Sequence, residues 1–180
     1  VLGARGCDKA AEFVSFCDAF NIPVLALVNV KGYKQSKCTE RRIAKAAGRL
    51  TYAFANADVP KVTVVIGEAY GSAYVTMNSK SIGADIVYAW PDAKIGMMDA
   101  AAAVKIMYAE EISASDKAAA LISEKAAEYE ALQSSAAAAA GRGYVDDIIK
   151  ADETRQRVIA AFEMLFTKRE GRPSRKHGTV

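Results

Sequence analysis

The segment at residues 61–78, KVTVVIGEAYGSAYVTMN, constrains the fold more than any other part of the sequence. An apolar, β-branched run at residues 62–66 is typical of a buried strand, and an apolar helix pattern follows Gly71, Ser72 and Ala73. The sequence therefore predicts a strand, a short turn and a helix that begins near Ala73. The free N–H groups of such a helix start form a site for developing negative charge.

The same order of strand, turn and helix recurs along the chain, which predicts an α/β fold. Residues 24–30 (VLALVNV) are apolar at nearly every position, as in a strand of a parallel sheet that is covered on both faces. Asp8 is the expected N-cap of the first helix, whose apolar positions include Phe13 and Phe20. Further strands are expected at residues 85–90 and 94–98, and helices at 8–20, 39–56, 73–79, 99–108, 115–133 and 152–166.

Length and charge limit the classes of function. The 180 residues suffice for one domain with a full core, which we place at residues 1–180. The net charge of +3 arises from the tail at residues 168–180, which holds five basic residues and one acidic residue. The remainder is close to neutral, which argues against a nucleic-acid partner. We expect the tail to be a packing or subunit-contact segment.

Cysteine usage and hydropathy indicate a compartment. The three cysteines include no C-x-x-C pair, so we expect neither a metal site nor a disulfide framework, and we expect a reducing, cytoplasmic location. No apolar run approaches the about 20 residues that span a bilayer, so we expect no direct membrane insertion. We expect no signal peptide, and a start at Val1 without methionine is typical of a fragment.

Few side chains are available for catalysis. The only histidine is His177, in the tail, where it is a poor general base. Ser72 lacks the G-x-S-x-G context of a nucleophile elbow, and a G-x-G-x-x-G dinucleotide fingerprint is absent. The main equipment is therefore a set of backbone donors, which suits stabilisation of an enolate or similar oxyanion, with the proton or carboxyl acceptor supplied by a cofactor.

Long segments of the sequence resemble one known family, the biotin-dependent carboxyltransferases. The family includes β-subunits of propionyl-CoA carboxylase and carboxyltransferase subunits of methylmalonyl-CoA and glutaconyl-CoA decarboxylases. The resemblance runs from about Asp8 to Gly178. The segments that carry it are CDAFNIPVLALVNVKGY, LTYAFANADVPKVTVVIGEAYGSAY, MNSKSIGADIVYAWPDAKIGMM, AAAAVKIMY, RGYVDDII and RPSRKHG.

The resemblance implies a crotonase-like ββα superhelix and only half of an active site. This chain resembles the C-terminal of the family's two carboxyltransferase domains, which mainly holds biotin, whereas a partner subunit's N-terminal domain mainly holds the acyl-CoA. It implies a homo-oligomer, trimer or hexamer, with biotin carried on a carboxyl carrier, another chain or domain. The cofactor is thus biotin and the substrate a coenzyme A thioester.

The resemblance also implies site residues. The family's Gly-Gly-Ala-Tyr turn matches Gly71-Ser72-Ala73-Tyr74, so the backbone N–H groups of Ser72 and Ala73 are the expected catalytic donors to the ureido oxygen of biotin. Val75 matches a position that helps to set acyl-chain preference. The remaining expected cofactor-binding residues, on two further segments, are Gly32, Tyr33, Met98, Asp99 and Ala100.

Two of these segments depart from the family pattern. The loop at residues 31–36 keeps only the first glycine, Gly32, of a common Pro-Gly-Phe-x-Pro-Gly loop. A common Met-Gly-x-x-Gly-Ala start is replaced by residues 98–103, MDAAAA, so Asp99 brings a carboxylate to a helix start. Asp99 is either an ordinary N-cap or a group that faces the site.

Three functions remain open. The first is carboxyl transfer between biotin and an acyl-CoA, with the isolated chain inactive because the acyl-CoA half is absent. The second is a stand-alone crotonase-like acyl-CoA enzyme that uses Glu68 or Asp99 as acid or base. The third is a non-catalytic assembly module of a carboxylase complex.

Overall fold

The computed structural model describes residues 1–115 and 117–171. His177 and most of the predicted basic tail lie outside this range. The strands are β1 (Val24–Val30), β2 (Lys61–Tyr70), β3 (Ile86–Ala89), β4 (Lys94–Gly96) and β5 (Asp147–Ile148). The helices are α1 (Ala4–Ala19), α2 (Lys37–Glu40), α3 (Ile43–Asn56), α4 (Gly71–Thr76), α5 (Ala100–Met107), α6 (Ala109–Ala114), α7 (Ala118–Tyr129), α8 (Ala136–Gly141) and α9 (Thr154–Met164), with a 3₁₀ turn η1 (Lys80–Ile82) and a π-helical turn η2 (Glu130–Ser134).

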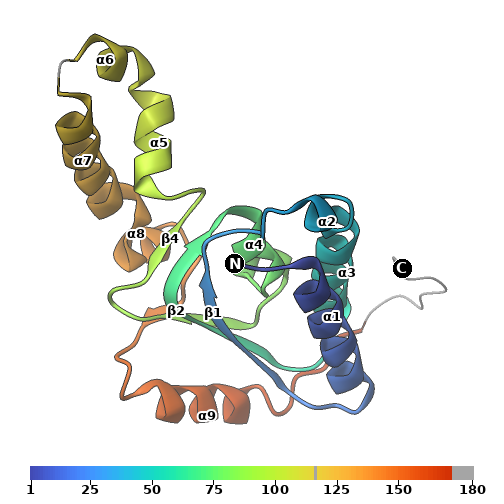
Figure 1. The fold of residues 1–180 in the computed structure, drawn as a ribbon. Helices are drawn as coiled ribbons and strands as arrows, with labels where there is room; N and C mark the ends of the chain where they lie inside the picture. The colour runs from blue at the N-terminus through green and yellow to red at the C-terminus, as the bar shows by residue number, and fades with distance from the viewer. Residues whose placement is uncertain (116, 172–180) are drawn as a thin grey trace.

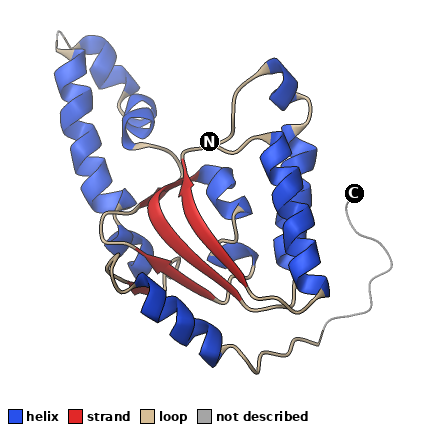
Figure 2. Ribbon diagram, turned by 60° about the horizontal axis from the view of Figure 1, so that its bottom comes forward, coloured by secondary structure: helices blue, strands red, loops and turns tan. Residues whose placement is uncertain are grey.

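The strands form one parallel sheet built around β2 (Figure 2). The order is β1-β2-β3-β5, and β4 pairs with the second half of β2, beyond the end of β3. Gly67 lies on β2 where the side chain of Asn29 approaches, since a Cβ atom here would be 2.9 Å from it. The long strand β2 thus pairs with β3 along its first half and with β4 along its second half.

Helices cover the sheet unevenly (Figure 1). α1 and α3 pack side by side and share a core that includes Cys7, Leu50 and Phe54. On the opposite face α9 covers Val62 and Val64 through Val158 and Ala161. Helices α5, α6 and α7 form an arm that extends away from the sheet in Figure 1.

The expectation that both faces of β1 are covered is wrong for this chain. Leu25 and Leu27 are 41% and 52% exposed. They pair in register with Val62 and Val64, so they lie on the face that α9 covers only over β2 and β3. The alternation of buried and exposed residues on β1 was hidden in the sequence because the exposed residues are themselves apolar.

The predicted start of the first helix is also wrong. Gly3, not Asp8, is the N-cap of α1, because Ala4 and Cys7 are buried against the neighbouring helix. Asp8 instead forms ion pairs with Arg42, the N-cap of α3, and with Arg49 in the middle of that helix. Phe13 and Phe20, predicted as apolar positions of this helix, are both exposed, and Phe20 lies just beyond its last residue as the C-cap.

Several predicted boundaries shift. The predicted helix at 39–56 is divided into α2, which Ser36 caps through Thr39 N at 3.2 Å, and α3. The helix predicted at 115–133 begins later, and α6 and α8 were not predicted; Ser135 caps α8 by accepting from Ala138 N. The Ala-rich run at 136–140 is therefore helical, which agrees with the high helix propensity of alanine.

Candidate functional site

The strand-to-helix junction is tighter than the sequence suggested. β2 continues through Tyr70, which is the N-cap of α4, so no separate turn precedes the helix and α4 begins at Gly71. Gly71 has φ +60°, and a Cβ atom there would lie 3.0 Å from the carbonyl oxygen of Met97. Only glycine meets both conditions without strain, which explains its place at this junction.

The first turn of α4 offers backbone donors. The N-cap Tyr70 makes no side-chain cap, and the amide groups of Ser72 and Ala73 have no side-chain acceptor among the residues that the structure describes. Ser72 is exposed at the surface, whereas the side chain of Ala73 is buried in the core. The exposed junction can therefore present N–H groups to a ligand oxygen that approaches from outside the chain.

The loop that carries Gly32 and Tyr33 is fastened to this helix. The Tyr33 hydroxyl lies 2.8 Å from Thr76 Oγ1 and donates to the carbonyl oxygen of Ser72 at 3.3 Å. Thr76 also donates to that carbonyl at 2.8 Å. The carbonyl oxygen of Gly32 accepts from Leu2 N at 2.9 Å, which holds the loop from its other side.

The segment with Met98, Asp99 and Ala100 reaches the same junction from β4. Gly96 pairs with Tyr70, and the next residue, Met97, contacts Gly71. The carboxylate of Asp99 accepts from Ala102 N at 3.0 Å, so the predicted N-cap is confirmed. Met98 and Asp99 are exposed, whereas Ala100 is buried, and it can contribute to a ligand site only through its backbone.

Tyr74 points into the core rather than toward the helix start. It belongs to the core cluster of the sheet, and its hydroxyl is buried without a hydrogen-bond partner among the described residues. Burial, with a smaller contribution from Tyr144, raises the pKa of Tyr74 to about 12. Val75, the next residue of α4, is half-buried.

Charged side chains surround Tyr70 at the junction. Burial, reinforced by the carboxylates of Glu68, Glu130 and Asp99, raises the pKa of Tyr70 to about 12. Glu130 forms a 2.7 Å ion pair with Lys94. Sequence reasoning missed Thr76, Met97 and Glu130. Only Thr76 carried a signal, as a hydroxyl residue one helical turn after Ser72.

Neither proposed acid–base carboxylate is free of structural contacts. Glu68 forms a 2.9 Å ion pair with Lys31, and Asp99 caps α5.

The described residues include no group of three or more histidine, cysteine or acidic side chains placed to hold a metal. Within the same residues, no helix is both long and apolar enough to cross a bilayer. Cys7 and Cys17 are buried thiols, and Cys38 is exposed.

The chain is similar in sequence to one family of known proteins. The sequence pattern of the carboxyl transferase domain family matches residues 1–180. The chain is 44% identical over 178 residues to the methylmalonyl-CoA carboxyltransferase 12S subunit of Propionibacterium freudenreichii subsp. shermanii, covering 98% of this chain and 34% of that subunit. It is 48% identical over 174 residues to a putative propionyl-CoA carboxylase beta chain of Bacillus subtilis (strain 168), covering 96% and 34% respectively. The chain thus spans about a third of the length of these relatives.

Solved structures agree with the sequence comparison. The transcarboxylase 12S crystal structure, a hexamer assembly with methylmalonyl-CoA and methylmalonic acid bound, matches with a TM-score of 0.94 at 44% identity, covering 99% of this chain and 34% of that one. The beta subunit of geranyl-CoA carboxylase from P. aeruginosa matches with a TM-score of 0.78 at 24% identity, covering 96% and 34%, and shows the fold alone. The predicted α/β, crotonase-like fold is thereby confirmed.

Proposed function

This chain belongs to the carboxyl transferase domain family, and we propose that it forms the biotin-side half of a site that transfers a carboxyl group between biotin and an acyl-CoA. Relatives that are 44% and 48% identical are named for methylmalonyl-CoA carboxyl transfer and propionyl-CoA carboxylation, which supports an acyl-CoA substrate. The observation that carries the proposal is the first turn of α4 at the end of β2, which its N-cap Tyr70 does not cap through a side chain and which is exposed at Ser72.

Biotin, when bound, would supply the nitrogen that carries the carboxyl group and that could accept the α-proton of the acyl-CoA. The chain's own part is electrostatic. The Ser72 and Ala73 N–H groups would donate to the ureido oxygen and stabilise negative charge there. This geometry fits the cofactor because both donors lack a side-chain acceptor and Ser72 is exposed.

The other predicted site residues shape the space around these donors. Gly71 allows the junction its positive φ, and Tyr33 holds the Gly32 loop against α4. We assign Met98, Asp99 and the backbone of Ala100 to the opposite wall, and Val75 to the side that borders the acyl chain. Tyr74 contributes through its backbone, since its side chain is in the core.

The acyl-CoA half lies on another polypeptide segment, the N-terminal carboxyltransferase half of a partner subunit. An uncovered apolar surface supports a partner of this kind. It comprises two groups of apolar side chains, Phe13, Phe16 and Phe20 along and at the end of α1, and Leu25 and Leu27 on β1, each between 41% and 64% exposed. We propose a homo-oligomer, trimer or hexamer, with the biotin on a separate carrier. We further propose a cytoplasmic location, because the three cysteines form no disulfide.

A pair of substitutions at one residue tests the backbone donors. Ser72→Pro removes the N–H group, whereas Ser72→Ala keeps it and removes only the hydroxyl. Titration of the ¹⁵N-labelled chain with biotin is expected to shift the amide signals of Ser72 and Ala73. Ser72→Ala retains the Ala73 shift and the affinity, and Ser72→Pro loses both while keeping the unfolding temperature of the core.

The result that would overturn this assignment is a set of biotin-induced shifts that excludes the start of α4. Equal biotin affinity in the proline and alanine variants would contradict it as well. Incubation of the isolated chain with methylmalonyl-CoA and free biotin is expected to give no turnover. Rapid turnover would contradict the division of the site between two halves.

A further inference from the structure

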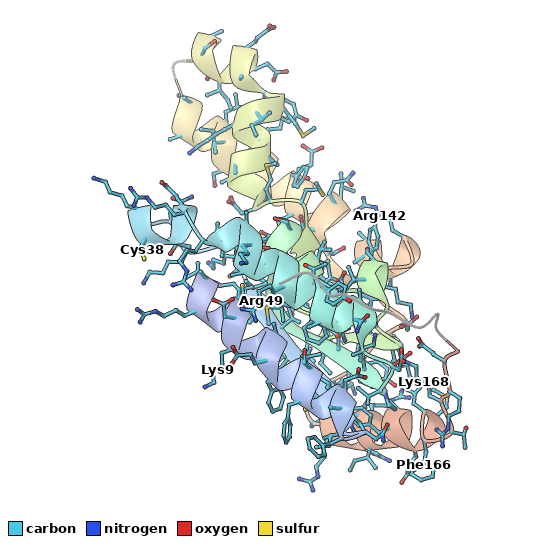
Figure 3. All side chains as sticks on the ribbon, turned by 90° about the vertical axis from the view of Figure 1, so that its right-hand side faces the viewer. Lys9, Cys38, Arg49, Arg142, Phe166 and Lys168 are labelled. Carbon is cyan, nitrogen blue, oxygen red and sulfur yellow. The ribbon has the colours of Figure 1, made fainter. Side chains whose placement is uncertain are left out.

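A hollow of about 240 Å³ lies at the junction of α1 with the segment that opens α3, and positive charge dominates its lining. Figure 3 shows Arg49 where these two helices lie side by side. The residues that line the hollow are Asp8, Arg41, Arg42, Lys45, Ala46 and Arg49. Four cations therefore converge with a single carboxylate.

The one carboxylate is shared between two of the cations. Arg42 donates to Asp8 Oδ2 at 3.4 Å, and Arg49 donates to Asp8 Oδ1 at 3.1 Å. Arg41 and Lys45 have no ion-pair partner in the part of the chain that the structure describes. Asp8 holds the two guanidinium groups in place but leaves most of their N–H donors available, since each guanidinium carries five.

Internal stability does not account for this arrangement. Lys45 and Arg49 are four residues apart on α3, so their like charges repel each other along the helix. The shared ion pairs are partly exposed, with 58% of the Arg42 and 31% of the Arg49 side chain accessible, and such pairs contribute little to folding. An external anion would relieve the repulsion.

The backbone adds to the same positive field. α3 is 14 residues long, and no side chain caps its first turn. The N–H groups of that turn and the positive end of the helix dipole lie beside Arg42 and Lys45. The planar fork of N–H donors on each guanidinium group matches the oxygens of a phosphate group, and the helix dipole adds positive potential at the same end of α3.

We propose that this hollow binds the phosphate groups of a nucleotide-type organic phosphate. The cations from Arg42 to Arg49 extend over about 10 Å of helix axis, which suits a ligand with at least two phosphate groups. The hollow is separate from the carboxyl-transfer site. Thr51, whose hydroxyl lies 3.3 Å from that of Thr76 on α4, is two residues from Arg49 and thus on another face of α3.

Calorimetric titration of the full chain with pyrophosphate, ADP, coenzyme A and dephospho-coenzyme A tests the proposal. At physiological ionic strength each of the four is expected to bind, and binding is expected to weaken steeply in 1 M salt. Arg42→Gln and Arg49→Gln are each expected to weaken binding about fivefold, the equivalent of one partly exposed charged contact. Arg155→Gln, an exposed arginine of α9, is the matched control and leaves the affinity unchanged.

Removal of the negative charge of Asp8 is expected to strengthen phosphate binding, whereas the arginine substitutions weaken it. Asp8→Asn removes the anion that competes for both arginines, so pyrophosphate is expected to bind more tightly. Coenzyme A that binds more tightly than both dephospho-coenzyme A and ADP identifies a coenzyme as the natural ligand, and equal affinities identify a free nucleotide. Failure of all four probes to bind overturns the proposal, as does affinity that is insensitive to Arg42 and Arg49.

Discussion

The hydroxyl of Tyr33 lies 2.8 Å from that of Thr76, so the loop after β1 is joined to α4 across 43 residues of sequence. Thr76 in turn bonds to the carbonyl oxygen of Ser72, which also accepts from Tyr33. These three residues form a closed network behind the helix start. Its position indicates that the loop and the proposed donors of α4 are held as one unit.

Replacement of Tyr33 by phenylalanine tests this unit. Loss of the hydroxyl is expected to lower the free energy of unfolding by about 1 kcal/mol, the net value of a typical hydrogen bond, and to weaken biotin binding by loosening the loop. Urea denaturation measures the first effect, and titration of the amide signals measures the second. Tyr144→Phe, at a half-exposed tyrosine, is the control and is expected to change neither; equal effects from both variants would contradict the network.

Gly71 is expected to tolerate no side chain. Gly71→Ala combines a positive φ with a 3.0 Å approach to Met97 O, and we expect it to lower the free energy of unfolding by about 2 kcal/mol. Gly48→Ala, in the exposed middle of α3 with nothing within 4 Å, is expected instead to stabilise the chain by about 0.5–1 kcal/mol. A neutral result at Gly71, measured by urea denaturation, would show that the junction relaxes easily.

The amino-acid pattern predicted the regular elements best where burial follows a simple period. Most of the helix predicted at 39–56 is present as α3, whose buried residues Ala46, Leu50 and Phe54 recur at helical spacing. Prediction failed on α1 and β1, where Phe13, Phe20 and Leu27 are apolar but exposed. Hydropathy alone does not distinguish an apolar side chain that is buried within the chain from one that lies on its surface and can contact another subunit.

The candidate site was predictable in outline because one helix start and its glycine are visible in the sequence. The structure brings the segments of Gly32–Tyr33 and Met98–Asp99 to that start, which no local pattern could show. The orientation of Tyr74 was not predictable, because an aromatic residue in the first turn of a helix suits either the core or a ligand. Asp8 was misassigned since it has the chemistry of an N-cap, while burial of Cys7 extends the helix past it.

The main role of Asp99 is expected to be stabilisation of α5, the first helix of the arm, as its N-cap. Asp99→Ala removes the N-cap and is expected to cost about 1 kcal/mol, whereas Asp99→Ser restores a capping oxygen and most of that stability. Thermal unfolding monitored by circular dichroism measures both variants. If the serine variant is as unstable as the alanine variant, the carboxylate has a role beyond capping, consistent with a group that faces the ligand.

Lys168 is expected to fasten the end of the described chain to the sheet. Its amino group lies 2.9 Å from Asp85, with 9% and 15% of the two side chains exposed. Asp85 also accepts from the backbone N–H group of Lys61 at 2.7 Å. Lys168→Ala removes the ion-pair partner of a largely buried carboxylate and leaves it only the backbone donor, so we expect the free energy of unfolding to fall by about 2–3 kcal/mol in urea denaturation.

Lys105→Ala, at an exposed lysine of α5, is the control for that loss. It is expected to remain within about 0.5 kcal/mol of the parent chain. Equal stability of the two variants would mean that the Lys168 contact contributes nothing to the fold.

The two tyrosines of the strand-to-helix junction are expected to make the fold less stable at alkaline pH. The pKa values of Tyr70 and Tyr74 are raised from 10.0 to about 12, so the folded chain retains their protons where the unfolded chain releases them. Because the folded state then binds more protons, the free energy of unfolding is expected to fall as the pH rises from about 10 to 12 and to be insensitive to these groups below pH 10. Urea denaturation at a series of pH values measures this slope.

Tyr74→Phe separates the two contributions. It removes one titrating group and a buried hydroxyl that has no hydrogen-bond partner within the described part of the chain, so the variant is expected to be more stable than the parent by about 1 kcal/mol at pH 7. Between about pH 10 and 12, the free energy of unfolding of this variant is expected to fall less steeply with pH, by the equivalent of one proton. The fall that remains is due mainly to Tyr70. Biotin binding should be retained, since only the backbone of Tyr74 borders the proposed site. A variant that loses stability at pH 7 and keeps the full alkaline slope would show that the Tyr74 hydroxyl is satisfied in solution and does not titrate with the fold.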